Sequence, residues 1–200
     1  MKQNIQNLLR NATLYIITLV LSLNLQITTA QASTIISDDM PLYSGDVAVL
    51  NDLIHANGLT QYAEQPLSLG IQVWEQGRLT FLLIDNSYLI SQLPQSIGNL
   101  TELQGLFLSN QSISSLPESI GQLGNLKKLH LDNNRLTILP STIGNLSNLN
   151  SLYLQNNRLN NLPASISKLT NLNTLNVSGN PLDITAFDAL PLEELTRFYQ

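Results

Sequence analysis

Side chains suited to acid–base or metal chemistry are few in this sequence. The 200 residues include two histidines and no cysteine. His130 and Asp132 are two residues apart, a spacing that places both side chains on the same side of a β-strand. A histidine beside a carboxylate can act as a general base, but no serine or cysteine nucleophile motif accompanies this pair. Two ligands also make a poor metal site. We therefore predict no catalytic residue, no metal site and no cofactor.

Four ring-bearing side chains favour binding instead. Phe107, His130 and Tyr153 follow one another at equal intervals of 23 residues, and Phe81 precedes them. Aromatic side chains are prominent among binding hot spots, and an exposed apolar patch with a polar rim marks an interaction surface. The alternative is that these rings only cover the backbone of the sheet that carries them.

The same interval runs through a much longer region. Residues 103–108, 126–131, 149–154 and 172–177 each carry leucine at positions one, four and six, except for a valine at the last of these places. A Leu-Pro pair and a later isoleucine recur in the second half of the first three of these units, at Leu116-Pro117, Leu139-Pro140 and Leu162-Pro163. A fixed period of this length is typical of stacked-repeat proteins. The pattern LxxLxLxxNxLxxLPxxIxxLxx resembles the leucine-rich repeat family, in its typical 23-residue class.

The resemblance implies an α/β solenoid with a parallel concave β-sheet, short helical turns on the convex side and an N-terminal helical cap. Asn134, Asn157 and Asn180 fall at position nine, where we expect them to bond backbone groups of neighbouring coils. Leaving such a buried group unpaired costs about 1–3 kcal/mol. Ser87 and Gln111 replace this asparagine in the first two coils. We therefore predict that the ladder begins only at Asn134 and that the first two turns are looser.

Residues that flank the core leucines of a strand point outward. We predict that this concave face is non-catalytic and binds a protein or peptide partner. The predicted contact residues are Phe81, Leu83, Asp85, Phe107, Ser109, Lys128, His130, Asp132, Tyr153, Gln155 and Asn176. A carbohydrate or cell-surface ligand that stacks on Phe107 and Tyr153 is the alternative. A structural surface protein without a specific ligand is the third possibility.

The first residues read as an export signal. A basic start and a mainly apolar stretch at 12–25 precede the cleavage signature Ala30-Gln31-Ala32. The apolar stretch is short for a membrane span, which needs about 20 residues. We predict a signal peptide at 1–32, no stable membrane span after its cleavage, and a secreted, periplasmic or cell-surface location.

The rest of the chain divides around the repeats. We predict a linker at 33–44, an N-terminal cap at 45–78, about 4.5 leucine-rich coils at 79–182 and a C-terminal cap at 183–200. The cap resembles the N-terminal region of exported leucine-rich repeat proteins. It lacks the paired cysteines often found there, which favours a bacterial source.

Within these parts, three details are predicted. Apolar residues at helical spacing indicate a helix that begins near Ser44 or Asp46 as N-cap and ends at Asn57-Gly58. In the first coil Leu89 is expected at core position eleven, although its Leu-Pro pair comes one residue late. A short closing helix is expected from residue 183 onward.

Charge is distributed unevenly along the chain. Residues 38–118 contain nine acidic residues and one basic residue, whereas residues 119–200 contain five acidic and six basic residues. The formal net charge of -5 argues against nucleic-acid binding. The formal glycosylation sequons at Asn99, Asn110, Asn145 and Asn176 are interpreted as a by-product of the repeat unless the source is eukaryotic.

Overall fold

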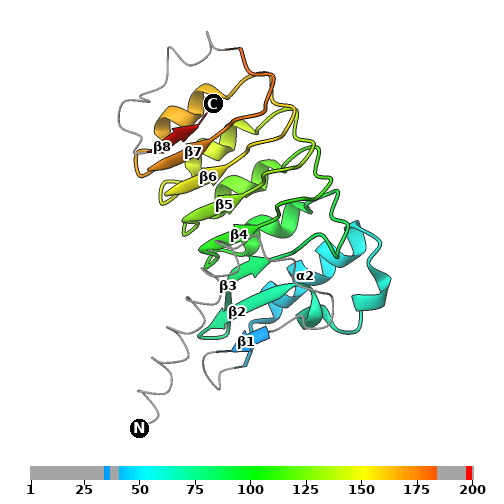
Figure 1. Ribbon diagram of the computed structural model, residues 1–200. Helices are drawn as coiled ribbons and strands as arrows, with labels where there is room; N and C mark the ends of the chain where they lie inside the picture. The colour runs from blue at the N-terminus through cyan, green and yellow to red at the C-terminus, as the bar shows by residue number, and fades with distance from the viewer. Residues whose placement is uncertain (1–33, 37–40, 184–196, 200) are drawn as a thin grey trace.

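The structure, a computed structural model, describes residues 34–36, 41–183 and 197–199. One sheet of eight strands follows the chain order. Strands β3 to β8 run parallel to one another, whereas β2 is antiparallel to β3 and pairs in parallel with β1. Figure 1 shows the strands along one side of the stack and the short helical turns along the other. The predicted α/β solenoid is therefore confirmed.

The elements repeat regularly after a less regular start. The strands are β1 (Thr34–Ile36), β2 (Ile71–Glu75), β3 (Arg78–Leu83), β4 (Gly105–Phe107), β5 (Lys128–His130), β6 (Ser151–Tyr153), β7 (Thr174–Asn176) and β8 (Arg197–Tyr199). The helical elements are the α-helix α2 (Ser44–Ala56) and the 3-10 helices η1 (Thr60–Tyr62), η2 (Pro66–Ser68), η3 (Gln95–Asn99), η4 (Glu118–Gln122), η5 (Ser141–Asn145) and η6 (Ala164–Lys168).

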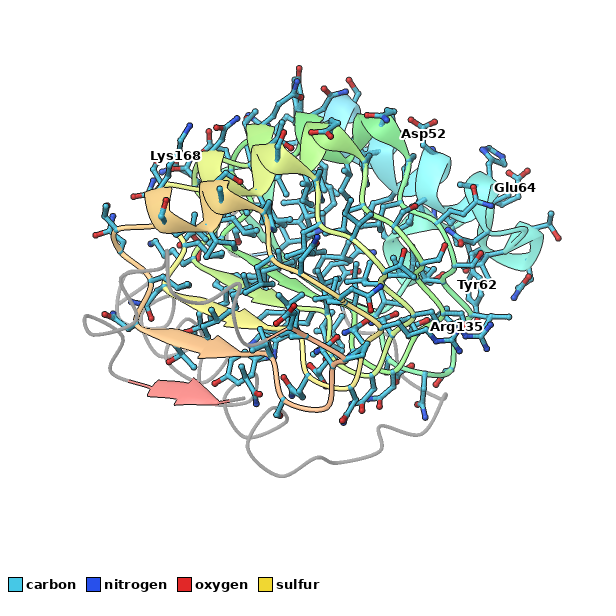
Figure 2. All side chains as sticks on the ribbon, turned by 90° about the horizontal axis from the view of Figure 1, so that it is seen from above. Asp52, Tyr62, Glu64, Arg135 and Lys168 are labelled. Atoms are coloured by element: carbon cyan, nitrogen blue, oxygen red, sulfur yellow. The ribbon has the colours of Figure 1, made fainter. Side chains whose placement is uncertain are left out.

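Each coil buries the same positions of the repeat. In the third coil Leu126, Leu129 and Leu131 are fully buried on the strand side, and Ile143 and Leu146 close the coil from the turn side. Burial of one such side chain contributes roughly 1.5–3 kcal/mol. Figure 2 shows side chains filling the space between the turns and the strands, with Asp52, Glu64 and Lys168 pointing outward on the helical side. The leucines therefore share one continuous core.

The recurring proline lies one place earlier than the position usually favoured for proline in helices. Pro117, Pro140 and Pro163 have extended backbone angles and precede η4, η5 and η6 as N-cap residues. Proline commonly occupies the first helical residue, where its missing N–H would have no partner. In this protein the ring instead fixes the φ angle of the residue that leads the chain into the turn.

The position-nine side chains form the expected ladder, but it starts one coil earlier than predicted. Asn157 Oδ1 accepts from Leu136 N at 2.9 Å, and Asn157 Nδ2 donates to the carbonyl oxygens of Leu131 and Leu154 at 2.8 and 2.9 Å. Gln111 occupies the same place in the second coil. Its Oε1 accepts from Ile90 N at 2.8 Å and its Nε2 donates to Asp85 O at 2.7 Å. The prediction that the ladder begins only at Asn134 is therefore wrong, because a glutamine amide makes the same bonds.

The first coil carries one extra residue, and its position differs from the prediction. Leu89, which was expected in the core, is 69% exposed, while Ile90 is fully buried. The extra residue therefore lies in the turn after β3, so that every later residue of this coil is displaced by one. Tyr88, in the same turn, is buried against Tyr62 with ring centroids 5.2 Å apart.

Helix α2 packs against η3 beside the first coil. Its predicted C-terminal end is confirmed: Asn57 is the C-cap, and Gly58 has the positive φ of 64° that glycine tolerates. Asn57 also joins the cap to the first coil, since its Oδ1 accepts from Ser91 N and Gln92 N at 2.7 and 3.0 Å.

The predicted N-cap of α2 is wrong. Tyr43 is the N-cap residue, and Asp46 is fully buried in the first turn of the helix. Both carboxylate oxygens of Asp46 accept from Arg78, at 2.9 and 3.1 Å, and Oδ2 also accepts from Leu79 N. The Arg78 guanidinium lies 4.5 Å from the centroid of the Tyr43 ring. Hydrogen bonding to Asp46 raises the pKa of Arg78, although burial opposes this change. Asp46 therefore fastens α2 to the first repeat strand instead of capping the helix.

The far end of the sheet contains a strand that the sequence analysis missed. β8 pairs in parallel with β7, with Thr174 opposite Arg197 and Asn176 opposite Tyr199. This offset of 23 residues is the repeat period, so β8 continues the sheet in the register of the coils. The predicted closing helix lies outside the described residues except for its first residue, Asp183.

Candidate binding face

The strand register aligns the predicted contact residues in columns across the coils. Leu83, Phe107, His130, Tyr153 and Asn176 are successive partners in the pairing of β3 to β7. We call this row the ring column. These residues occupy position five, so their side chains face away from the core leucines at positions four and six. The register thus brings together residues that are 23 or 24 positions apart in the chain.

Three members of the ring column contact one another directly. The ring centroids of Phe107 and His130 are 4.7 Å apart with planes at 57°, and those of His130 and Tyr153 are 4.3 Å apart at 38°. Both distances are close to the preferred range for ring pairs, and the tilted arrangements avoid face-to-face repulsion. His130 and Tyr153 remain partly exposed on the outer face of the sheet.

Phe107 differs from the prediction, because its side chain is only 3% exposed. It lies on the outer face but is covered, and it does not belong to the interior core. Gly105 explains part of this cover. A Cβ atom at Gly105 would lie 2.4 Å from Cδ1 of Phe81 and 2.7 Å from Cε2 of Phe107. The two phenylalanine rings therefore fold over Gly105, and Phe107 is no free platform for a ligand.

His130 is held in its neutral form. Burial among its neighbours, with a smaller contribution from the charge of Lys128, lowers its pKa to about 4. Desolvation disfavours the charged imidazolium, which is the physical cause of this direction. At neutral pH the centre of the face is therefore an uncharged ring that can pack against apolar groups.

A second column runs beside the rings at position seven. We call Asp85, Ser109, Asp132, Gln155 and Ser178 the acceptor column, and all five are partly exposed. Ser109 Oγ donates to Asp132 Oδ1 at 2.6 Å across neighbouring coils. Asp132 Oδ2 accepts from Asn133 at 2.9 Å, and Asp85 Oδ1 accepts from Ser87 N at 2.9 Å.

The other predicted contact residues complete the face at its two margins. Phe81 and Lys128 align with Gly105 at position three, and Lys128 is exposed. Asn176 ends the ring column, but its Oδ1 accepts from both Ser178 N and Ser178 Oγ. Gly105 was not among the predicted contact residues, although a glycine aligned between Phe81 and Phe107 was the available signal.

The described residues show neither a cluster suited to a metal ion nor a helix suited to a membrane. In that part of the chain no group of three or more histidine, aspartate or glutamate side chains is placed to hold a metal ion. None of its helices combines the length and apolar character that a membrane crossing needs.

Comparisons with known proteins agree with the geometry. A family model described as "Leucine-rich repeat region" matches residues 71–152, and one described as "Leucine rich repeat" matches residues 125–182. No curated protein matches the sequence.

Solved structures from bacteria and plants are similar to this chain. A leucine-rich repeat protein of Leptospira interrogans is 26% identical with a TM-score of 0.51, over 66% of this chain and 43% of its own. A plant peptide hormone receptor, RGFR1 in complex with RGF2, is 27% identical with a TM-score of 0.52, over 60% of this chain and 20% of its own. The leucine-rich repeat ectodomain of the receptor kinase SOBIR1 from Arabidopsis thaliana shares the fold, with a TM-score of 0.62 at 24% identity over 80% of this chain and 93% of its own.

The chain thus spans less than half the length of the Leptospira protein and a fifth of the RGFR1 receptor. The two family models overlap and together cover residues 71–182, which run from β2 through the regular coils to just beyond the last ladder asparagine, Asn180. Residues 71–182 of this protein are a leucine-rich repeat region.

Proposed function

We propose that this protein is a non-catalytic binding module that recognises a protein or peptide on the outer face of its sheet. The observation that carries the proposal is the ring column, which lies outside the continuous core yet is partly exposed at His130 and Tyr153. Leucine-rich repeat folds generally serve protein–protein binding, and the similar RGFR1 structure contains a bound partner, RGF2.

The same face supports a carbohydrate ligand less well. That alternative needs two free stacking platforms, Phe107 and Tyr153, and Phe107 is covered. Of these two platforms only Tyr153 stays exposed, and it lies on the same face as the acceptor column and Lys128. This mixture of apolar, acidic and basic groups suits a polypeptide with mixed side chains. A surface protein without a specific ligand is the outcome if no partner is found.

A photo-crosslinking experiment tests the proposal. A photoreactive phenylalanine replaces Tyr153 in one variant and Ile138 in a control; Ile138 is 59% exposed and lies off the sheet face. We expect a partner from the native extracellular or periplasmic fraction to crosslink to the first variant only. His130→Ala, added to the first variant, should reduce the yield of that crosslink. Equal crosslinking from both positions, or none from position 153, would show that the face is not the binding site.

We also propose that the chain is exported and that residues 1–32 are removed. The similar SOBIR1 structure is an ectodomain, which is consistent with an extracellular setting. The cleavage signature lies outside the described residues, and strand β1 begins at Thr34, two residues after Ala32. Mass spectrometry of the exported protein should find Ser33 at its N-terminus. An intact Met1 on exported protein would exclude cleavage.

A further inference from the structure

The acceptor column carries negative charge that no described residue neutralises. The carboxylates of Asp85 and Asp132 accept hydrogen bonds only from uncharged groups, and neither forms an ion pair within the described part of the chain. Gln155 continues the column with a buried side-chain oxygen, Oε1, that has no hydrogen-bond partner. A ligand with cationic donors would complement this column.

The basic side chain of the face lies on the opposite side of the rings. Along coil three, Lys128, His130 and Asp132 follow one another at positions three, five and seven, so the strand presents a cation, a neutral ring and an anion in turn. A cationic ligand is therefore repelled at position three and attracted at position seven. Its charged groups should lie over the acceptor column, with its uncharged groups over the rings.

The spacing of the two carboxylates limits the shape of such a ligand. Asp85 and Asp132 belong to coils one and three, and neighbouring strands are about 4.8 Å apart, so the column places them about 9.6 Å apart. A polyproline II segment repeats every three residues and rises about 3.1 Å per residue, so residues i and i+3 point the same way at about 9.3 Å.

Other regular conformations fit this spacing less well. Residues i and i+3 of a β-strand are about 10 Å apart but point in opposite directions. An α-helix returns to the same face after seven residues, over about 10.5 Å, and is wider than the single column beside the rings. Polyproline II segments also dock on aromatic surfaces, which the adjacent His130 and Tyr153 rings supply.

We propose that the partner presents an extended, proline-rich segment with arginine or lysine at positions i and i+3. These two cations bind Asp85 and Asp132, and the residues beyond the cation on Asp132 pack on the His130–Tyr153 pair. This inference rests on the proposed function, because it names the kind of peptide that the same face recognises.

Two labelled peptides of equal composition test the inference by fluorescence anisotropy. The first, PPRPPRPP, has arginines three apart, and the second, PPRPRPPP, has them two apart. We expect the first to bind about fivefold more tightly, since the second can pair only one arginine with a carboxylate. Equal affinities would show that only overall charge is sensed and would overturn the inference.

Isosteric variants locate the contacts. Asp85→Asn and Asp132→Asn should each weaken binding of the first peptide about three- to fivefold, and the loss should shrink as salt is raised. Glu118→Gln is the matched control, because it removes one exposed negative charge from η4 on the turn side. A loss with Glu118→Gln equal to that with Asp132→Asn would contradict the site. Thermal unfolding of each variant shows whether the fold is kept. The comparison of the two peptides uses the unsubstituted protein, so it tests the inference even if a variant fails to fold.

The outcomes also separate this inference from the proposed function. If neither peptide binds but the partner still crosslinks at position 153, the polyproline II segment is wrong and the binding face stands. If PPRPPRPP binds, with the expected losses in the Asp85 and Asp132 variants, the inference holds even where no native partner is captured.

Discussion

At the scale of single residues, His130 links burial to pH. Its pKa is lowered to about 4 from an ordinary value of 6.5. The unfolded chain therefore takes up a proton at this ring at a higher pH than the folded chain does, and stability falls as the pH drops from about 6.5 toward about 4. The free energy of unfolding falls by at most about 3 kcal/mol over this range, and by less where solvent reaches the ring.

His130→Phe should remove this part of the pH dependence, because a phenyl ring keeps the stack and does not titrate. Urea unfolding at about pH 7 and about pH 5 measures the effect, since most of the difference accumulates between the two pKa values. His55→Gln, at the other, exposed histidine, serves as the control. A His130→Phe protein with an unchanged pH dependence would mean that the ring is protonated as easily in the folded state as in the unfolded state.

The ladder amides are the second feature at this scale. Asn157→Ala removes hydrogen bonds from three buried backbone groups, those of Leu131, Leu136 and Leu154. Each unpaired group costs about 1–3 kcal/mol, partly relieved by water, so we expect a loss of about 3 kcal/mol in the free energy of unfolding. Asn160→Ala, at an exposed site of the same coil, should change it by less than about 0.5 kcal/mol. Denaturant midpoints of the two variants provide the comparison, and similar midpoints would rule out a structural ladder.

At the scale of elements, the extra residue of coil one decides which side chain enters the core. Ile90→Ser places a hydroxyl in a fully buried site and removes most of an aliphatic side chain, so we expect a loss of about 3 kcal/mol. Leu89→Ser, at a site that is 69% exposed, should be nearly neutral. Thermal unfolding of both variants tests the assignment, and the reverse order of stabilities would restore Leu89 to the core.

The packing of successive 3-10 helices depends on glycine at one position of the repeat. A Cβ at Gly144 of η5 would lie 2.3 Å from Ser165 O in η6, whereas a Cβ at Gly124 would have no neighbour within 4 Å. Gly144→Ala should therefore destabilise the fold by about 1–3 kcal/mol, because the backbones of two turns must separate. Gly124→Ala provides the matched control and should not destabilise the fold. Chemical denaturation that finds equal stabilities would show that the turns have room to move.

At the scale of the whole molecule, the coils form a nearest-neighbour stack in which each unit covers the next. The ladder extends from Gln111 through Asn134 and Asn157 to Asn180. The looser first turns predicted from the sequence are therefore expected only around the extra residue of coil one. Hydrogen exchange should find the amides of Ile90, Ile113 and Leu136 protected alike, because each donates to a ladder side chain. Protection that rises steadily from Ile90 to Leu136 would favour the original expectation.

The sequence by itself determined the repeat. The period of 23 residues predicted the coils, their buried leucines and most of the asparagine ladder, because each depends on a short pattern that recurs at every step. It also predicted the end of α2 at Asn57, since a helix C-cap is a local signal. The binding role of the outer face stays a prediction.

Only the tertiary structure decided what depends on contacts between distant parts of the chain. Phe107 is covered because rings from two coils meet over Gly105, and Asp46 leaves the N-cap position because Arg78, 32 residues later, pairs with it. The register of β8 likewise became visible only through its pairing with β7. A repeat pattern predicts which side of a strand a residue faces. The residues that bury it or form an ion pair with it come from other coils, so these contacts exist only once the coils have stacked.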